Sequence, residues 1–246
     1  MTLINAAKPF LILFMGLLVF GACGQHSATI PSTQTASGAY EKGSWQLRRH
    51  AELNEIARRG HIDLVFLGDS ITQKWEDVGR EIWDNYYSRR KAVNFGMGGD
   101  RTQHVLWRIE HGNFEGIHPK AIIILIGINN SNSVNTAQEI ADGVMAVVQK
   151  LREKVPESKI LLLAILPSEE RAENPQRVRA IAANAIFQKV ADGRMIRYLD
   201  IGDRFTNQDG TISKEIMPDF LHLGPRGFEL WAEAIEPVVK DLMGEK

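Results

Sequence analysis

The strongest constraint on the fold is a set of five short apolar runs, separated along the chain by stretches with helical periodicity. The runs cover 62–67, 92–95, 121–126, 160–165 and 196–201. Most of them do not alternate apolar with polar residues, and β-branched side chains are frequent in them, as in strands buried on both faces. Strands that alternate with helices form a mostly parallel sheet covered on both sides. The sequence therefore predicts an α/β fold, a three-layer α/β/α sandwich with a flavodoxin-like five-stranded parallel sheet.

Two of the intervening helices have clear boundary signals. The stretch 136–155 places its apolar residues on one face, and Thr136 with Glu139 forms a capping box at its start. Pro225 is expected at the first position of a final helix, where its missing N–H costs nothing. Pro237 is expected to kink or end the regular part of that helix.

The first residues are typical of an export signal rather than of a folded domain. Lys8 precedes an apolar run over 9–20, which is too short for a transmembrane helix and suits the hydrophobic core of a signal peptide. The stretch 19–23 (VFGAC) resembles a lipoprotein cleavage site, and Cys23 is the only cysteine of the chain. We expect a lipoprotein-type signal peptide over 1–22, lipidation of Cys23, and an exported protein of the periplasm, outer membrane or cell surface. Plain secretion is the alternative.

The composition separates a tether from a folded domain. Residues 23–40 are rich in Ser, Thr and Ala and show no helical or strand period, which predicts a flexible tether between a membrane anchor and the domain. The domain is expected over 41–246. A net charge of −1 argues against a nucleic-acid partner. A single cysteine excludes an intrachain disulfide.

Polar residues follow the predicted strands, at the edge where an open parallel sheet binds its ligands. Ser70 ends a Gly-Asp-Ser turn, Gly99 lies in a glycine-rich run, and Asn129 follows the third strand. Asp219 precedes His222 by three residues, so its carboxylate can hold the Nδ1–H of that histidine. Each motif alone has an ordinary explanation as a turn or a helix cap. Their joint occurrence, in the order Ser, Asp, His, favours a hydrolase with a serine nucleophile.

Together these residues resemble the four motif blocks of the SGNH (GDSL-like) hydrolases. The blocks are Gly68-Asp69-Ser70, Gly99, Asn129, and Asp219 with His222. Within that family the chain is most similar to the catalytic subunits of intracellular platelet-activating-factor acetylhydrolase, through residues 94–102, 104–108 and 219–223. The resemblance covers 41–246, the whole expected domain.

The resemblance implies the SGNH hydrolase fold and a serine esterase with Ser70, His222 and Asp219 as its catalytic triad. It further implies an oxyanion hole made by the backbone N–H groups of Ser70 and Gly99 and by the Asn129 side chain. We expect no cofactor. No metal is expected either, because the histidines at 104 and 111 share a helix face without a third ligand.

The expected export and the lack of a long apolar lid favour short acyl esters, acetyl esters above all, such as O-acetylated carbohydrates. The alternatives are a lysophospholipase or thioesterase with a longer acyl pocket, and a catalytically silent envelope-binding lipoprotein. An export signal is foreign to an intracellular enzyme, so platelet-activating factor is not carried over as the substrate. The polar loop 167–175 is expected either to border the site or to be merely solvated.

The expected partners are a small-molecule or carbohydrate ester and, through the lipid anchor, a membrane. A homodimer is left open, because relatives that dimerise allow one but no apolar stripe in this chain indicates it.

Overall fold

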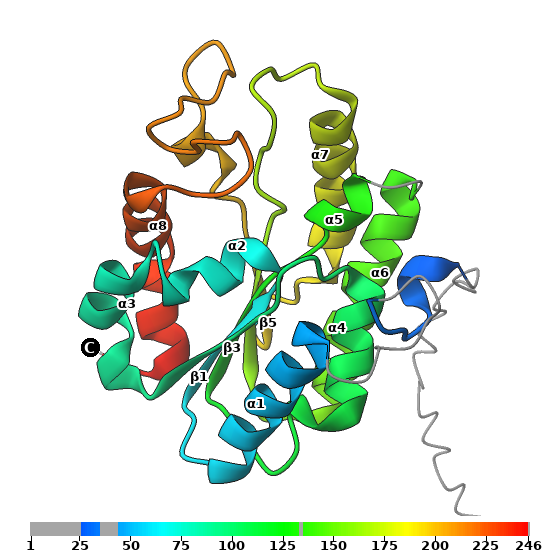
Figure 1. Cartoon of the computed structure of the whole chain (residues 1–246), viewed down its shortest axis with the longest axis vertical. Helices are drawn as coiled ribbons and strands as arrows, with labels where there is room; N and C mark the ends of the chain where they lie inside the picture. Colours follow the sequence, from blue (N-terminus) through cyan, green and yellow to red (C-terminus); the bar gives the residue numbers. More distant parts are fainter. Residues whose placement is uncertain (1–25, 35–43, 133–134, 246) are drawn as a thin grey trace, which may run out of the picture.

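Five parallel strands form the centre of the molecule, in the order β2-β1-β3-β4-β5 (Figure 1). The strands are β1 (Leu64–Gly68), β2 (Ala92–Gly96), β3 (Ala121–Leu125), β4 (Lys159–Leu163) and β5 (Ile196–Leu199). In β1 and β3 every residue is buried, because helices cover both faces. The predicted flavodoxin-like five-stranded sheet is confirmed.

The structure, a computed structural model, describes residues 26–34, 44–132 and 135–245. The signal peptide expected over 1–22 and the lipidation site expected at Cys23 lie outside these residues. None of the helices in the described ranges is long and apolar enough to cross a bilayer.

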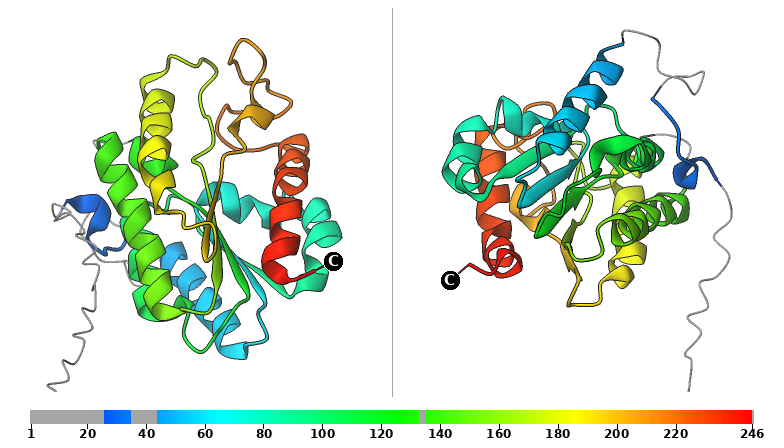
Figure 2. Two further views of the ribbon diagram at one scale, coloured as in Figure 1. Left: turned by 180° about the vertical axis from the view of Figure 1, so that it is seen from behind. Right: turned by 90° about the horizontal axis from the view of Figure 1, so that it is seen from below.

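The helices lie on both faces of the sheet, with α3 and α8 on one side and α4, α6 and α7 on the other (Figures 1 and 2). The α-helices are α1 (Trp45–Arg59), α2 (Ser70–Gln73), α3 (Arg80–Tyr86), α4 (Thr102–Arg108), α5 (Ile128–Ser131), α6 (Ala137–Lys154), α7 (Pro175–Phe187) and α8 (Pro225–Met243). Short 3₁₀ helices occupy Ser27–Thr29, Lys74–Glu76, Ser88–Arg90, Gln188–Val190 and Gly202–Phe205, and a π-helical turn, Ile109–Asn113, follows α4. On the α3–α8 side, rings of Phe66, Trp75, Tyr87 and Trp231 pack together and fill the core.

Two predicted helix boundaries agree with the structure, whereas the helix end expected as one alternative at Pro237 does not. Thr136 and Glu139 form the predicted capping box of α6, and Pro225 begins α8. Pro237 does not end α8, which continues to Met243. The helix residues Ile235 and Val239 on either side of Pro237 are fully buried. Their packing offsets the backbone hydrogen bond that proline removes, a loss of about 3 kcal/mol.

Residues 26–34, here called the N-terminal segment, differ from the flexible tether expected over 23–40. Ala28 is completely buried, and its carbonyl accepts a hydrogen bond from Thr102 Oγ1 at 2.8 Å. The backbone N–H of Ser32 donates to the Gln103 carbonyl at 3.1 Å. The segment therefore lies on α4 and α6 (Figure 2) and is part of the folded domain.

Candidate active site

Ser70 begins α2 directly after β1, at a turn that leaves no room for a side chain at Gly68. A Cβ at Gly68 would lie 2.2 Å from Thr72 Oγ1 and 2.3 Å from the Leu125 carbonyl oxygen. Asp69 caps α2, since its Oδ1 accepts the backbone N–H of Ile71 at 3.0 Å. The close approach and the cap together place the Ser70 hydroxyl at the carboxyl edge of the sheet.

Asp219 and His222 lie on the turn before α8, and a single carboxylate organises that turn. Asp219 Oδ1 accepts the backbone N–H groups of Leu221, at 3.1 Å, and of His222, at 2.7 Å. Phe220, between Asp219 and Leu221, has φ +58°, and the two hydrogen bonds hold it in this left-handed region. Asp219 Oδ2 is then 2.7 Å from Nδ1 of the His222 ring.

These two chain segments, 152 residues apart, meet at one hydrogen bond. Ser70 Oγ is 2.9 Å from Nε2 of His222. Partial burial opposes ionisation of Asp219, but the hydrogen bonds from the His222 ring and backbone and from the Leu221 N–H lower the pKa of Asp219 overall. A carboxylate that stays charged fixes the Nδ1–H tautomer, which leaves Nε2 free to take the hydroxyl proton. The arrangement can therefore activate Ser70 as a nucleophile.

The glycine-rich loop after β2 passes beside Ser70. A Cβ at Gly98 would be 3.8 Å from Ser70 Cβ and 3.6 Å from the ring of Trp45, whose side chain is exposed. Gly99 is exposed and has φ +79°, a conformation that favours glycine. Asn129 Nδ2 donates to the Asp100 carbonyl at 2.8 Å, so Asn129 lies against this loop. The structure thus brings Ser70, Gly99 and Asn129 to one edge, as the sequence predicts.

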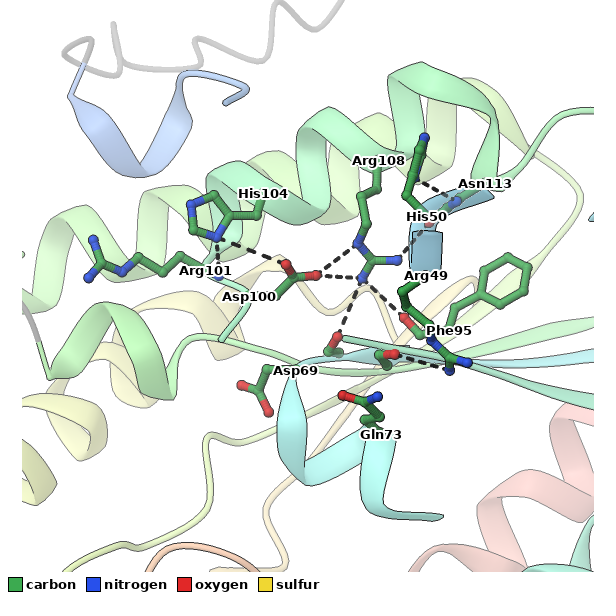
Figure 3. A network of polar contacts seen from close by, with 12 residues as sticks. Arg49, His50, Asp69, Gln73, Phe95, Asp100, Arg101, His104, Arg108 and Asn113 are labelled. Atoms are coloured by element: carbon green, nitrogen blue, oxygen red, sulfur yellow. Dashed lines mark hydrogen bonds and ion pairs between the residues drawn. The ribbon is translucent and has the colours of Figure 1, made fainter. Parts of the chain in front are cut away.

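A buried arginine supports the loop from the protein interior (Figure 3). Arg108 on α4 is completely buried, and its Nε donates to Asp100 Oδ2 at 2.8 Å. Its other nitrogens donate to the Phe95 carbonyl at 3.0 Å and to Asn113 Oδ1 at 2.6 Å. Arg108 therefore connects the end of β2, the loop and the π-helical turn. Arg101 occupies the N-cap position of α4, and the Asp100 carboxylate before it binds Arg108.

Asp69 adds a second buried carboxyl group next to Ser70. Burial above all, with a smaller contribution from the negative charge of Asp100, raises the pKa of Asp69 to about 7, although the hydrogen bond from the Ile71 N–H opposes the shift. Its Oδ2 has no hydrogen-bond partner among the described residues. The group therefore carries its proton through the mildly acidic range.

The loop 167–175 does border the site. Its Glu169 N–H donates to the Phe220 carbonyl at 2.7 Å, which joins the loop to the turn that carries His222. Arg177 on α7 holds the loop in place, with Nε 2.8 Å from the Ser168 carbonyl and Nη2 2.7 Å from the Glu169 carbonyl.

Three residues around the site were not predicted from the sequence. Gln73 Oε1 accepts the Gly98 N–H at 2.7 Å, and Gln34 Nε2 donates to the Gly98 carbonyl at 3.0 Å. Arg108 is the third. Arg108 lies in the stretch 104–108 that carries the family resemblance, but its position eight residues after Asp100 matches no neighbouring helical pair and does not indicate their contact.

The histidines at 104 and 111 contact other groups of the protein. His104 Nδ1 accepts the Arg101 N–H at 3.0 Å, and the His111 ring stacks on Trp107. Within the part of the chain that the structure describes, no three His, Cys, Asp or Glu side chains are arranged to hold a metal ion.

Known proteins resemble this chain in both sequence and fold. Residues 66–230 match the model of the GDSL-like lipase/acylhydrolase family. Platelet-activating factor acetylhydrolase IB subunit alpha2 of Rattus norvegicus is 38% identical over 187 residues, which are 74% of this chain and 78% of that protein.

Two solved structures show the same fold at low sequence identity. A GDSL-like lipase from Bacteroides thetaiotaomicron superposes with a TM-score of 0.64 at 15% identity, over 79% of this chain and 97% of that one. A catalytic mutant of an acetylxylan esterase from Geobacillus stearothermophilus superposes with a TM-score of 0.57 at 17% identity, over 76% of this chain and 96% of that one.

Proposed function

Because the chain belongs to the GDSL-like lipase/acylhydrolase family and is an ester hydrolase of that type, we propose that Ser70 is its nucleophile and short acyl esters, acetyl esters above all, are its substrates. The observation that carries the proposal is the chain of hydrogen bonds from Ser70 Oγ to His222 Nε2, and from His222 Nδ1 to Asp219 Oδ2. This is the arrangement that serine hydrolases need.

The reaction proceeds in two steps. Ser70 Oγ attacks the ester carbonyl carbon while His222 Nε2 takes the hydroxyl proton, and Asp219 stabilises the resulting imidazolium. The tetrahedral intermediate collapses, the alcohol leaves with the proton from His222, and an acyl-Ser70 ester remains. Water, deprotonated by His222, then attacks this ester and releases the carboxylic acid and free Ser70.

The negative oxygen of each intermediate is held by the N–H groups of Ser70 and Gly99 and by the Asn129 side chain. Asn129 Nδ2 gives one hydrogen to the Asp100 carbonyl. Its second hydrogen has no partner among the described residues, so it is free to bind the oxyanion.

The names of the relatives support an acetyl group as the acyl portion of the substrate. The exposed ring of Trp45 supports a sugar as its alcohol portion. The platelet-activating factor acetylhydrolase subunit and the acetylxylan esterase are both named for acetyl groups, although their alcohol portions differ. Trp45, 44% exposed, lies beside Gly98 at the edge of the site. Its indole offers an apolar face on which a sugar ring can stack, which favours an O-acetylated carbohydrate.

The test is hydrolysis of p-nitrophenyl acetate, butyrate and octanoate by the full chain, with Ser70→Ala and the exposed control Ser88→Ala. We expect the highest kcat/KM for acetate, a loss of about 10⁴-fold or more in Ser70→Ala, and no change in Ser88→Ala. A fluorophosphonate probe should label every variant except Ser70→Ala. Preference for octanoate would replace the short-acyl assignment, and full activity of Ser70→Ala would remove Ser70 from the mechanism.

We also propose that the protein is exported and carries a lipid on Cys23, in keeping with the apolar run over 9–20 that precedes the cysteine. Cells fed an alkyne-tagged fatty acid should label the wild-type chain and leave Cys23→Ser unlabelled. A wild-type chain that is cleaved and released without label would instead indicate plain secretion.

A further inference from the structure

The loop that carries Gly99 is held from several elements, and one of the contacts comes from outside the strand–helix core. Gln73 on α2 accepts the Gly98 N–H, and Asn129 after β3 donates to the Asp100 carbonyl. Arg108 on α4 binds the Asp100 carboxylate. The remaining contact is made by Gln34, the last residue of the N-terminal segment.

Gln34 bridges the two residues on either side of Gly99. Its side-chain Nε2 donates to the Gly98 carbonyl at 3.0 Å and to Asp100 Oδ1 at 2.5 Å. Its Oε1 would lie 3.3 Å from a Cβ at Gly99, so the carboxamide covers the outer side of that residue. Gly99 is exposed and has φ +79°, a region that glycine enters easily, and the turn around it is closed by the Asp100 N–H, which donates to the Met97 carbonyl at 3.2 Å. The amide of Gln34 adds a restraint from the outer side, on the residues before and after Gly99.

The N-terminal segment is docked firmly enough to hold Gln34 in place. Ala28 has no exposed surface, and its carbonyl faces Thr102 and Gly143, where a Cβ would come within 2.9 Å of it. His26 Nε2 lies 3.2 Å from Asp142 Oδ2 on α6, and the Ser32 N–H is bonded to α4. The segment thus crosses α6 and α4 and ends at the loop.

We propose that the N-terminal segment completes the active site and that Gln34 is a positioning residue for the Gly99 N–H. The inference rests on the proposed function, because it assigns Gln34 to the same oxyanion hole. Gln34 does not touch the substrate. It fixes the donor direction of Gly99, and a donor displaced by about 1 Å stabilises the transition state much less.

The test compares Gln34→Ala and Gln34→Met with wild type and with Gln149→Ala in the full chain. Gln149 matches the change, because its Nε2 also donates to a carboxylate, that of Glu153, at 3.0 Å on the exposed face of α6. The readouts are kcat and KM for p-nitrophenyl acetate, the inhibition constant of methylboronic acid, and the thermal midpoint. The boronic acid forms a tetrahedral adduct with the nucleophile and reports on the oxyanion hole directly.

We expect kcat to fall about tenfold in Gln34→Ala, a smaller loss than removal of a donor produces. KM should stay within about twofold, and the inhibition constant should rise by the same factor as kcat falls. Gln34→Met keeps the volume of the side chain without its donors, so it should lose kcat by the same factor at an unchanged thermal midpoint, and it decides the test if the alanine variant is poorly folded. Gln149→Ala should match wild type.

A second pair of variants moves the whole segment. Ala28→Glu places a charge at a completely buried position and should undock the segment, lowering kcat as much as Gln34→Ala does. Ser27→Glu adds the same charge at an exposed neighbour and should leave kcat unchanged. Wild-type kcat and boronic acid affinity in the Gln34 variants would overturn the inference, while loss of activity in Ser70→Ala would still support the proposed function.

Discussion

At the scale of single residues, the proposed mechanism uses both hydrogens of the Asn129 side-chain amide. One hydrogen of Nδ2 goes to the Asp100 carbonyl and steadies the loop, and the proposed role of the other is to bind the oxyanion. In that role the residue would both support the loop that carries Gly99 and supply a donor of its own. Removing the side chain removes both hydrogen bonds, and a carboxylate of the same shape removes them too, because it has no N–H to donate.

We predict that Asn129→Ala lowers kcat by about 100- to 1000-fold, because one oxyanion donor is lost. Asn129→Asp should be at least as severe, since a carboxylate cannot donate and repels the oxyanion. Steady-state kinetics with p-nitrophenyl acetate measures both, and circular dichroism checks the fold. Asn207→Ala, at an exposed turn, is the control and should keep full activity. Turnover of Asn129→Ala close to wild type would exclude Asn129 from the oxyanion hole.

The sequence allowed some of these residues to be predicted and not others, for a physical reason. Ser70, Gly99 and Asn129 each follow a strand, and the carboxyl ends of neighbouring parallel strands share an edge. Arg108 and Gln34 lack such a signal. An arginine on a helix is normally a solvated charge, and nothing local in the sequence shows that Asp100 is buried opposite Arg108.

At the scale of elements, the turn between β1 and α2 contains the N-cap residue Asp69, whose carboxyl group changes its protonation near neutral pH. Burial holds the pKa of Asp69 at about 7 in the folded protein, well above the ordinary value of 3.8. Above pH 3.8 the unfolded chain loses this proton while the folded chain keeps it. The contribution of Asp69 to the free energy of unfolding is therefore full at low pH and falls as the pH rises toward 7.

Asp69→Asn keeps a good N-cap and removes the titration. We predict that the free energy of unfolding of Asp69→Asn, relative to wild type, rises between pH 4 and pH 7 by up to about 4 kcal/mol and is level above that. Urea unfolding at a series of pH values measures the difference. Asp209→Asn, in an exposed turn, is the matched control. A relative stability that does not change over this range would mean that Asp69 is ionised in the folded protein.

Elements with a strong period were predictable, whereas those held by tertiary contacts were not. The five strands and α6 have apolar patterns that only one burial arrangement satisfies. The N-terminal segment has no period, and its contacts are hydrogen bonds to residues far along the chain, such as Thr102, 74 positions from Ala28. Proline normally disfavours the interior of a helix, but α8 continues past Pro237 because the residues around it are buried against the core.

At the scale of the whole molecule, the residues of the proposed mechanism come together at one edge of the sheet. Ser70 follows β1, the glycine-rich loop follows its neighbour β2, and His222 lies on the turn before α8. The parallel topology predicts this edge, but the pairing of particular side chains depends on loops such as 167–175 and on Arg177, whose role only the folded chain reveals.

Because His26 contacts α6, the chain between a lipid on Cys23 and the folded domain would be short. Only three peptide steps separate Cys23 from His26, a span of at most about 11 Å. The folded domain of a lipidated chain would therefore be held close to the bilayer surface. It would meet embedded esters by lateral diffusion, so its turnover on them would follow their surface density, whereas esters dissolved in the bulk would be met at the ordinary rate in three dimensions.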